Sequence, residues 1–124
     1  MKILRLAWMI ALLGGGLSSA IAEDYYDQLR AEAAQEAPGE VQLHVIKTHG
    51  QLSDFTSKIR EVVKVPGWAQ IRVEGEAAFS AWDSYRKDYV WRHGRFEVLF
   101  DIGDRENLKL NSVRFDGQTT HADF

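Results

Sequence analysis

The last third of the chain alternates apolar and polar residues, and this alternation constrains the fold more than any other feature of the sequence. Two alternating runs, Lys87–Trp91 and Phe96–Ile102, are followed by a third over Leu108–Phe115. The residues His93-Gly94 between the first two runs suit a tight hairpin turn, which would put the large apolar residues of both runs on one face. The pattern therefore predicts a three-stranded antiparallel meander at the C-terminal end.

The third run contains a change of phase. Its apolar parity switches between Leu110 and Val113, which predicts a β-bulge near Asn111-Ser112. A looser turn is expected over Gly103–Asn107, before this run. The segment Asp116–Phe124 is polar, and we expect it to be a frayed tail.

Helical and strand patterns alternate before the meander. The expected elements are a helix over Glu23–Ala37 ended by Pro38-Gly39, a strand over Val41–Lys47, a helix over 52–63 and a strand over Ala69–Glu74. The second helix is expected because Leu52, Phe55, Ile59 and either Val62 or Val63 recur at helical spacing, and it should end before Pro66-Gly67.

The segment Gly75–Tyr85 has two interpretations. Phe79 and Trp82 are three residues apart, which favours a short helix, whereas a glycine bulge would let the preceding strand continue. With the helix, the order is α-β-α-β-(short α)-β-β-β. This order predicts an α+β fold in which two main helices pack on one face of an antiparallel sheet.

The first 22 residues have the pattern of a secretory signal peptide. Lys2 and Arg5 precede the apolar run Leu6–Leu13, and Ala20 and Ala22 supply the small residues required for cleavage. The run is shorter than the ~20 residues that span a membrane. The sequence therefore predicts a signal peptide over 1–22, a single domain over 23–115, a tail over 116–124 and a periplasmic or secreted location. A retained membrane anchor is the alternative.

The composition excludes several classes of function. The chain has no cysteine, so disulfides, thiolate metal sites and cysteine nucleophiles are ruled out. Its net charge is −3, and the predicted signal peptide carries basic residues and no acidic ones, so the exported part is more acidic still. Binding of nucleic acid, which needs a basic surface, is not expected. A membrane is expected as a partner only if the anchor is retained.

No catalytic motif, metal site or cofactor site is expected. The chain has neither a G-x-S-x-G nucleophile motif nor, outside the signal peptide, a glycine-rich phosphate loop. The spacing of the histidines matches no standard zinc site; they are His44, His49, His93 and His121. Glu74 and Glu76 flank Gly75 and could act as paired carboxylates, but charged residues at a strand end are the simpler interpretation.

The richest cluster of functional residue types combines arginine with aromatic side chains. The candidate binding residues are Trp82, Tyr85, Tyr89, Trp91, Arg92 and Arg95. Arg92 and Arg95 would flank the predicted turn and project together. Arginine beside aromatic residues is typical of interface hot spots, although a packed sheet with a salt-bridged solvent face gives the same composition.

These observations predict a small, exported, non-enzymatic binding module that contacts a protein partner in the cell envelope through an Arg/aromatic hairpin. An accessory subunit, an inhibitor and an immunity-type protein are all of this kind. The alternative is a cavity-type α+β domain that binds or transforms a small molecule. In that domain the four aromatic residues would line a pocket, and one of His44, Glu74, Glu76 or Asp83 would supply the polar group.

Overall fold

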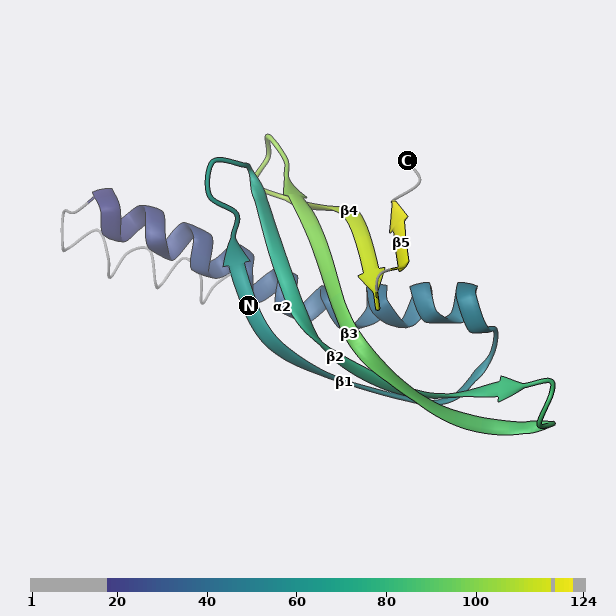
Figure 1. The fold of residues 1–124 in the computed structure, drawn as a ribbon. Helices are drawn as coiled ribbons and strands as arrows, with labels where there is room; N and C mark the ends of the chain where they lie inside the picture. The colour runs from purple at the N-terminus through teal and green to yellow at the C-terminus, as the bar shows by residue number, and fades with distance from the viewer. Residues whose placement is uncertain (1–17, 117, 122–124) are drawn as a thin grey trace.

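The computed structural model describes residues 18–116 and 118–121, with side chains described over 25–116. One long helix and a five-stranded antiparallel sheet make up these residues (Figure 1). The elements are α2 (Ser18–His49), β1 (Leu52–Lys64), β2 (Gln70–Asp83), β3 (Asp88–Ile102), β4 (Leu108–Phe115) and β5 (Gln118–His121). The strands lie in the sheet in chain order, so the sheet is a simple meander. The predicted α+β class is confirmed, with one helix in place of the two expected.

The core lies between α2 and one face of the curved sheet, which we call the inner face (Figure 1). The helix contributes a buried residue every four positions: Leu29, Ala33, Ala37, Val41 and Val45. The sheet contributes alternate residues of its central strands, among them Ile71, Val73, Phe79, Val98 and Phe100. The opposite face, which we call the outer face, is turned away from α2.

The predicted strand over Val41–Lys47 is wrong, and so is the predicted helix end at Pro38-Gly39. Both segments belong to α2. A strand would bury Leu43 together with its alternate neighbours, but Leu43 is 55% exposed while Val41 and Val45 are fully buried. Proline inside a helix costs about 3 kcal/mol, and full burial of each valine returns about 1.5–3 kcal/mol. Packing against the sheet therefore carries the helix through Pro38.

The predicted helix over 52–63 is also wrong, because these residues form β1. The pairing of β1 with β2 shifts between Leu52 and Asp54 and again between Ile59 and Glu61. Each shift is a bulge that adds one residue, so inward-facing positions lie three apart there instead of two. Two bulges thus gave a strand an apolar spacing that resembles that of a helix.

For the segment Gly75–Tyr85, the strand interpretation is confirmed to Asp83 and the short helix is wrong. β2 runs without interruption from Gln70 to Asp83, and its pairing with β3 has no shift. The irregularity lies instead on β1, opposite Gly75.

The hairpin turn predicted at His93-Gly94 is wrong, because β3 passes straight through these residues. Gly94 marks a close approach rather than a turn. A Cβ atom at this position would lie only 2.4 Å from a carboxylate oxygen of Asp116. A glycine between two alternating runs can mark either a turn or a place inside a strand where another group comes close, and the sequence pattern does not distinguish these cases.

The turn between β2 and β3 lies over residues 84–87 instead. The carboxylate of Asp83 accepts hydrogen bonds from the backbone N–H groups of Tyr85 and Arg86, at 2.9 and 3.2 Å. The N–H of Lys87 donates to the carbonyl oxygen of Asp83 at 2.7 Å. Lys87 takes a left-handed conformation with φ 53°. Asp83 therefore holds the turn from its first position.

The structure contains the bulge and the turn predicted for the C-terminal region. Leu99 pairs with Ser112 and Phe100 with Leu110, which leaves Asn111 as the bulge residue. The turn over Gly103–Asn107 is closed by a 2.8 Å hydrogen bond between its two end residues. Both predictions are confirmed.

The described residues cover only part of the predicted signal peptide and of the predicted tail. The frayed tail is wrong for Gln118–His121, which pair with β4 as β5, and the other residues after Asp116 lie outside the described residues. The predicted signal peptide lies outside them over residues 1–17, and the backbone of 18–22 continues α2. Within the part of the chain that the structure describes, no helix is long and apolar enough to cross a membrane.

Two glycines give a matched test of this packing. A Cβ atom at Gly75 would lie 2.3 Å from the carbonyl oxygen of Lys58 and 2.6 Å from the Phe96 ring, whereas one at Gly39, inside α2, would meet nothing within 4 Å. Gly75→Ala is expected to lower the free energy of unfolding by about 1–3 kcal/mol through overpacking. Gly39→Ala is expected to raise it by about 0.5–1 kcal/mol. Urea denaturation of both variants measures the difference, and equal effects would contradict the described close approach at Gly75.

Candidate functional site

The end of the β2–β3 hairpin extends beyond the rest of the sheet, at the lower right of Figure 1. On one side, β1 begins opposite Ala81. On the other side, β4 pairs with β3 only from Phe96 onward. We call residues 82–92 the hairpin extension. Among the described residues, their only strand neighbours are β2 and β3 themselves, and the end of the hairpin protrudes beyond Ala81.

Large aromatic side chains gather on the hairpin extension and are exposed. The exposed fractions are 50% for Trp82, 98% for Tyr85, 43% for Tyr89 and 58% for Trp91. Trp82 and Tyr89 are directly paired across the strands, with ring centroids 5.5 Å apart in an edge-to-face arrangement. The pairing of Trp91 with Ser80 places it on the same outer face. The structure thus brings four of the six predicted binding residues together in one exposed cluster.

Arg92 also belongs to the hairpin extension, but it lies on the inner face, where it pairs with Phe79. Its guanidinium nitrogen lies 3.6 Å from the carboxylate of Asp83. The pKa of Asp83 is held below its ordinary value chiefly by the backbone hydrogen bonds from Arg86 and Tyr85, and then by the charges of Arg92 and Arg86. Arg92 therefore supports the residue that holds the turn.

Arg95 lies outside this cluster. It pairs with Glu76 in the middle of the sheet, on the outer face, and its backbone N–H lies 3.4 Å from a carboxylate oxygen of Asp116. Since Arg92 and Arg95 are three residues apart on one continuous strand, their side chains leave from opposite faces. The predicted joint projection of the two arginines is wrong for this reason.

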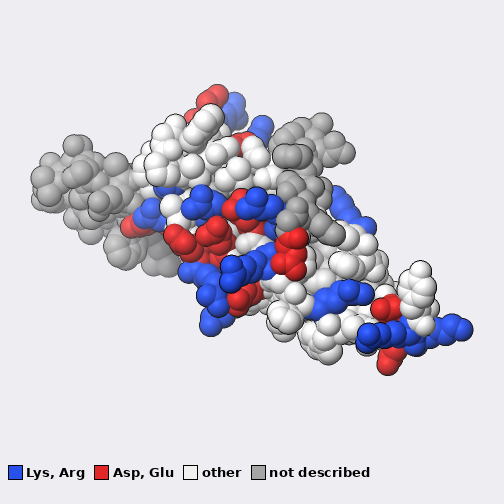
Figure 2. All heavy atoms as spheres, in the orientation of Figure 1, with Lys and Arg blue, Asp and Glu red and all other residues white. Residues whose placement is uncertain are grey.

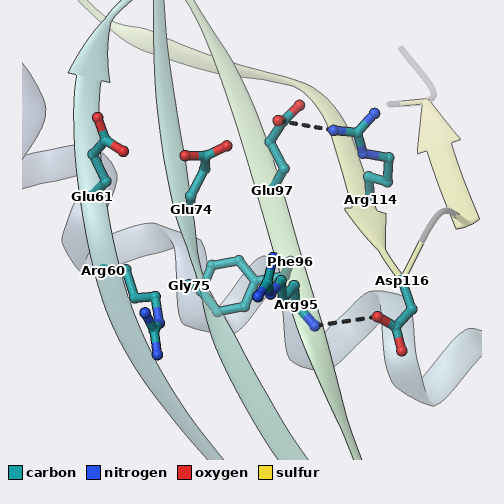
Figure 3. Close-up of a pocket in the computed structure, with 9 residues that line it drawn as sticks. All are labelled: Arg60, Glu61, Glu74, Gly75, Arg95, Phe96, Glu97, Arg114 and Asp116. Carbon is teal, nitrogen blue, oxygen red and sulfur yellow. Dashed lines mark hydrogen bonds and ion pairs between the residues drawn. The ribbon is translucent and has the colours of Figure 1, made fainter.

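A shallow groove of about 840 Å³ crosses the outer face in the middle of the sheet (Figure 3). Its lining is mostly charged and comprises Arg60, Glu61, Glu74, Gly75, Arg95, Phe96, Glu97, Arg114 and Asp116. Figure 2 shows basic and acidic side chains intermixed over this part of the surface.

Ion pairs join the charged groups of this face. Glu97 lies 3.0 Å from Arg114. Glu74 lies 3.7 Å from Arg72, and Glu76 lies 3.1 Å from Arg60. Glu74 and Glu76 thus have arginine partners at an open surface. This is the salt-bridged solvent face that the composition also allowed.

The groove does not match the small-molecule pocket that was the alternative prediction. None of Trp82, Tyr85, Tyr89 and Trp91 lines it. The described residues also contain no group of three or more histidine, aspartate or glutamate side chains placed to hold a metal ion.

His44, another candidate for the polar group of a pocket, lies in the interior between helix and sheet. It is 5% exposed, and neither ring nitrogen has a hydrogen-bond partner among the described residues. Burial holds the pKa of His44 below its ordinary value, with smaller contributions from His49 and Lys47. His44 therefore packs as a neutral residue of the core at neutral pH.

The sequence analysis missed Asp83 as the residue that holds the turn, and it placed the turn at 93–94 instead of 84–87. The signal for the correct turn was present: Asp83-Ser84 is followed by the polar pair Arg86-Lys87. Groove residues such as Arg60 and Arg114 are brought together only by strand register, which the sequence does not reveal.

Comparisons with protein-family models, curated proteins and solved structures find no match for the chain.

The burial of His44 predicts that acid destabilises the fold. The unfolded chain takes up a proton on this residue near pH 6.5, whereas the folded chain does so only at a lower pH. The free energy of unfolding should therefore fall as the pH drops from 7 to 5. His44→Leu should reduce that fall, as measured by urea denaturation at both pH values. A fall of the same size in the variant and the parent would show that His44 does not cause it.

Proposed function

We propose that this chain is a small, exported, non-enzymatic binding module that contacts a protein partner of the cell envelope through its hairpin extension. The observation that carries the proposal is the cluster of Trp82, Tyr85, Tyr89 and Trp91, all at least 43% exposed. The core does not need these side chains, since its buried residues are supplied by α2 and the body of the sheet. An accessory subunit, an inhibitor or an immunity-type protein would present such a surface.

The residue types of the hairpin extension favour a protein as the partner. Tryptophan, tyrosine and arginine are the residues most enriched at interface hot spots. The two tryptophans and two tyrosines gather on the hairpin extension, with Arg86 in its turn, whereas exposed apolar residues on an ordinary surface are scattered.

The hairpin extension is also well ordered for binding. Trp82 and Asp83, the last two residues of β2, are both paired with β3. Asp83 also accepts three hydrogen bonds that close the turn. Because these contacts fix the backbone before a partner arrives, little conformational entropy remains to be lost on binding.

The charge of the hairpin extension differs from that of the whole chain. Arg86, Lys87 and Arg92 outnumber Asp83 and Asp88 here, whereas the chain as a whole has a net charge of −3. The complementary partner surface is therefore apolar where it meets the aromatic residues and acidic where it meets Arg86 and Lys87 in the turn.

A non-enzymatic role is supported by the state of the ionisable groups on the outer face. Glu74 and Glu97 line the open groove, and they and Glu76 each have an arginine partner, whereas catalytic carboxylates usually converge in an enclosed pocket. Export rests on the pattern of Met1–Ala22 alone.

The test is affinity capture from the native envelope fraction, using the full chain with a C-terminal tag and mass spectrometry of what is retained. A Trp82→Ala/Trp91→Ala variant should lose at least about tenfold in affinity for any specific partner, equivalent to ~1.4 kcal/mol. It should unfold at nearly the same temperature as the parent, because both side chains are exposed.

Trp68→Ala is the matched control. Trp68 is 67% exposed but lies in the turn between β1 and β2, at the other end of the sheet. This variant should bind like the parent. A partner retained equally by the double variant, or lost with Trp68→Ala, would place the binding surface elsewhere.

A further inference from the structure

The strand β3 has a free edge along the hairpin extension. β2 pairs with β3 from Asp88 onward, but on the other side β4 pairs with it only from Phe96. Asp116 donates a backbone hydrogen bond to the carbonyl oxygen of Arg95 at 2.9 Å, so the polar groups of Arg95 face the β4 side. Because this direction alternates along a strand, the N–H and C=O groups of Tyr89, Trp91 and His93 face the same side. No described strand pairs with them.

The other edge of the sheet is different. β1 carries two bulges, and charged residues follow one another along it: Asp54, Lys58, Arg60 and Glu61. Bulges and charges are the usual means by which edge strands avoid pairing with another chain. The free edge of β3 has no register shift against β2 and carries Val90 and Trp91 at its centre. It is therefore the better template for an added strand.

The sequence at this edge is complementary to itself. Since edge-facing residues must pair with edge-facing residues, an antiparallel copy can align only in alternate registers. In one of these, Val90 lies opposite Val90 of a second copy. Asp88 then lies opposite Arg92, and Tyr89 opposite Trp91, each pair occurring twice. Opposite charges and aromatic pairs directly across from each other both stabilise a sheet.

We propose that two copies of this chain associate through the free edge of β3, antiparallel and related by a two-fold axis at Val90. The next permitted register, centred on Trp91, places Asp88 opposite Gly94 and Val90 opposite Arg92, so it loses both ion pairs. The seven residues from Asp88 to Gly94 accommodate the five-pair ladder before Arg95, where Asp116 takes over the pairing.

The association goes beyond the proposed partner binding and does not depend on it. The two-fold axis would join the two sheets into one and set two copies of the outer-face cluster of Trp82, Tyr89 and Trp91 side by side. The free edge and the aromatic face are separate surfaces of the same hairpin extension. Either can therefore fail without the other.

Cysteine cross-linking tests both the association and its register, because the chain has no cysteine of its own. Opposed residues of a non-hydrogen-bonded pair have Cα atoms about 4.5 Å apart, which a disulfide can span. Val90→Cys in the full chain should form a covalent dimer under mild oxidation. Ser57→Cys, an exposed position on β1, is the control for random collisions and should stay monomeric.

The outcomes separate clearly. Efficient cross-linking of Val90→Cys alone supports the proposal. Cross-linking through Trp91→Cys instead would overturn the register, and equal yields for Val90→Cys and Ser57→Cys, or no dimer from either, would overturn the association.

A charge swap provides a second test without cysteine. Sedimentation equilibrium of the parent chain should show a dimer whose fraction rises with protein concentration. Arg92→Asp should abolish it by opposing two aspartates, and the swap Asp88→Arg/Arg92→Asp should restore it, because the ion pairs re-form in reversed order. Circular dichroism checks that each variant is folded. A monomeric parent chain, or a swap that fails to restore the dimer, would contradict the proposed edge.

Discussion

The structure depends on the packing of one helix stripe against the inner face of the sheet. Ala33, Ala37, Val41 and Val45 recur every four residues and are completely buried. They meet the central strands through side chains such as Phe79 and Phe100. With no cysteine to close a disulfide, this contact has to supply the stability of the described fold. It is strong enough to keep Pro38 inside a helix, against the preference of that residue for a helix start or a turn.

The ends of α2 and β1 together set where the packed part of the sheet stops. α2 ends at His49, whose ring lies 5.2 Å from that of Phe79. β1 begins at Leu52, opposite Ala81, and beyond Ala81 the strands β2 and β3 continue as a two-stranded ribbon. Trp82 and Tyr89 of this ribbon lie on the outer face, away from α2. An isolated hairpin is only marginally stable, so a well-formed one must be anchored to the sheet and closed by its turn. The extension thus combines an exposed aromatic face with an open strand edge, and both proposals follow from that combination.

How much of this could be predicted depended on whether local pattern or tertiary context decided each element. The third C-terminal strand, its bulge at Asn111 and the strand starting near Ala69 followed from alternation alone. The segment Val41–Lys47 satisfied the alternation of a strand and the spacing of a helix, and only packing against the sheet decides between them.

β1 was mistaken for a helix because its two bulges changed the spacing of its apolar residues. Gly94 was mistaken for a turn because the need for space beside Asp116 arises from a residue that is distant in sequence. The four aromatic residues of the predicted site lie close in sequence, so alternation alone placed them near one another, whereas the strand face and location of Arg92 and Arg95 required the true register.

Hydroxyl-radical footprinting of the full chain tests the central claim that the hairpin extension is the binding surface. The chain alone at low concentration should be oxidised readily at Trp82, Tyr85, Tyr89 and Trp91, and also at Trp68, since all five are exposed. In the presence of the envelope fraction, the four residues of the hairpin extension should become protected while Trp68 stays reactive. Protection that falls on Trp68 or on the charged groove, and leaves the hairpin extension reactive, would contradict the account.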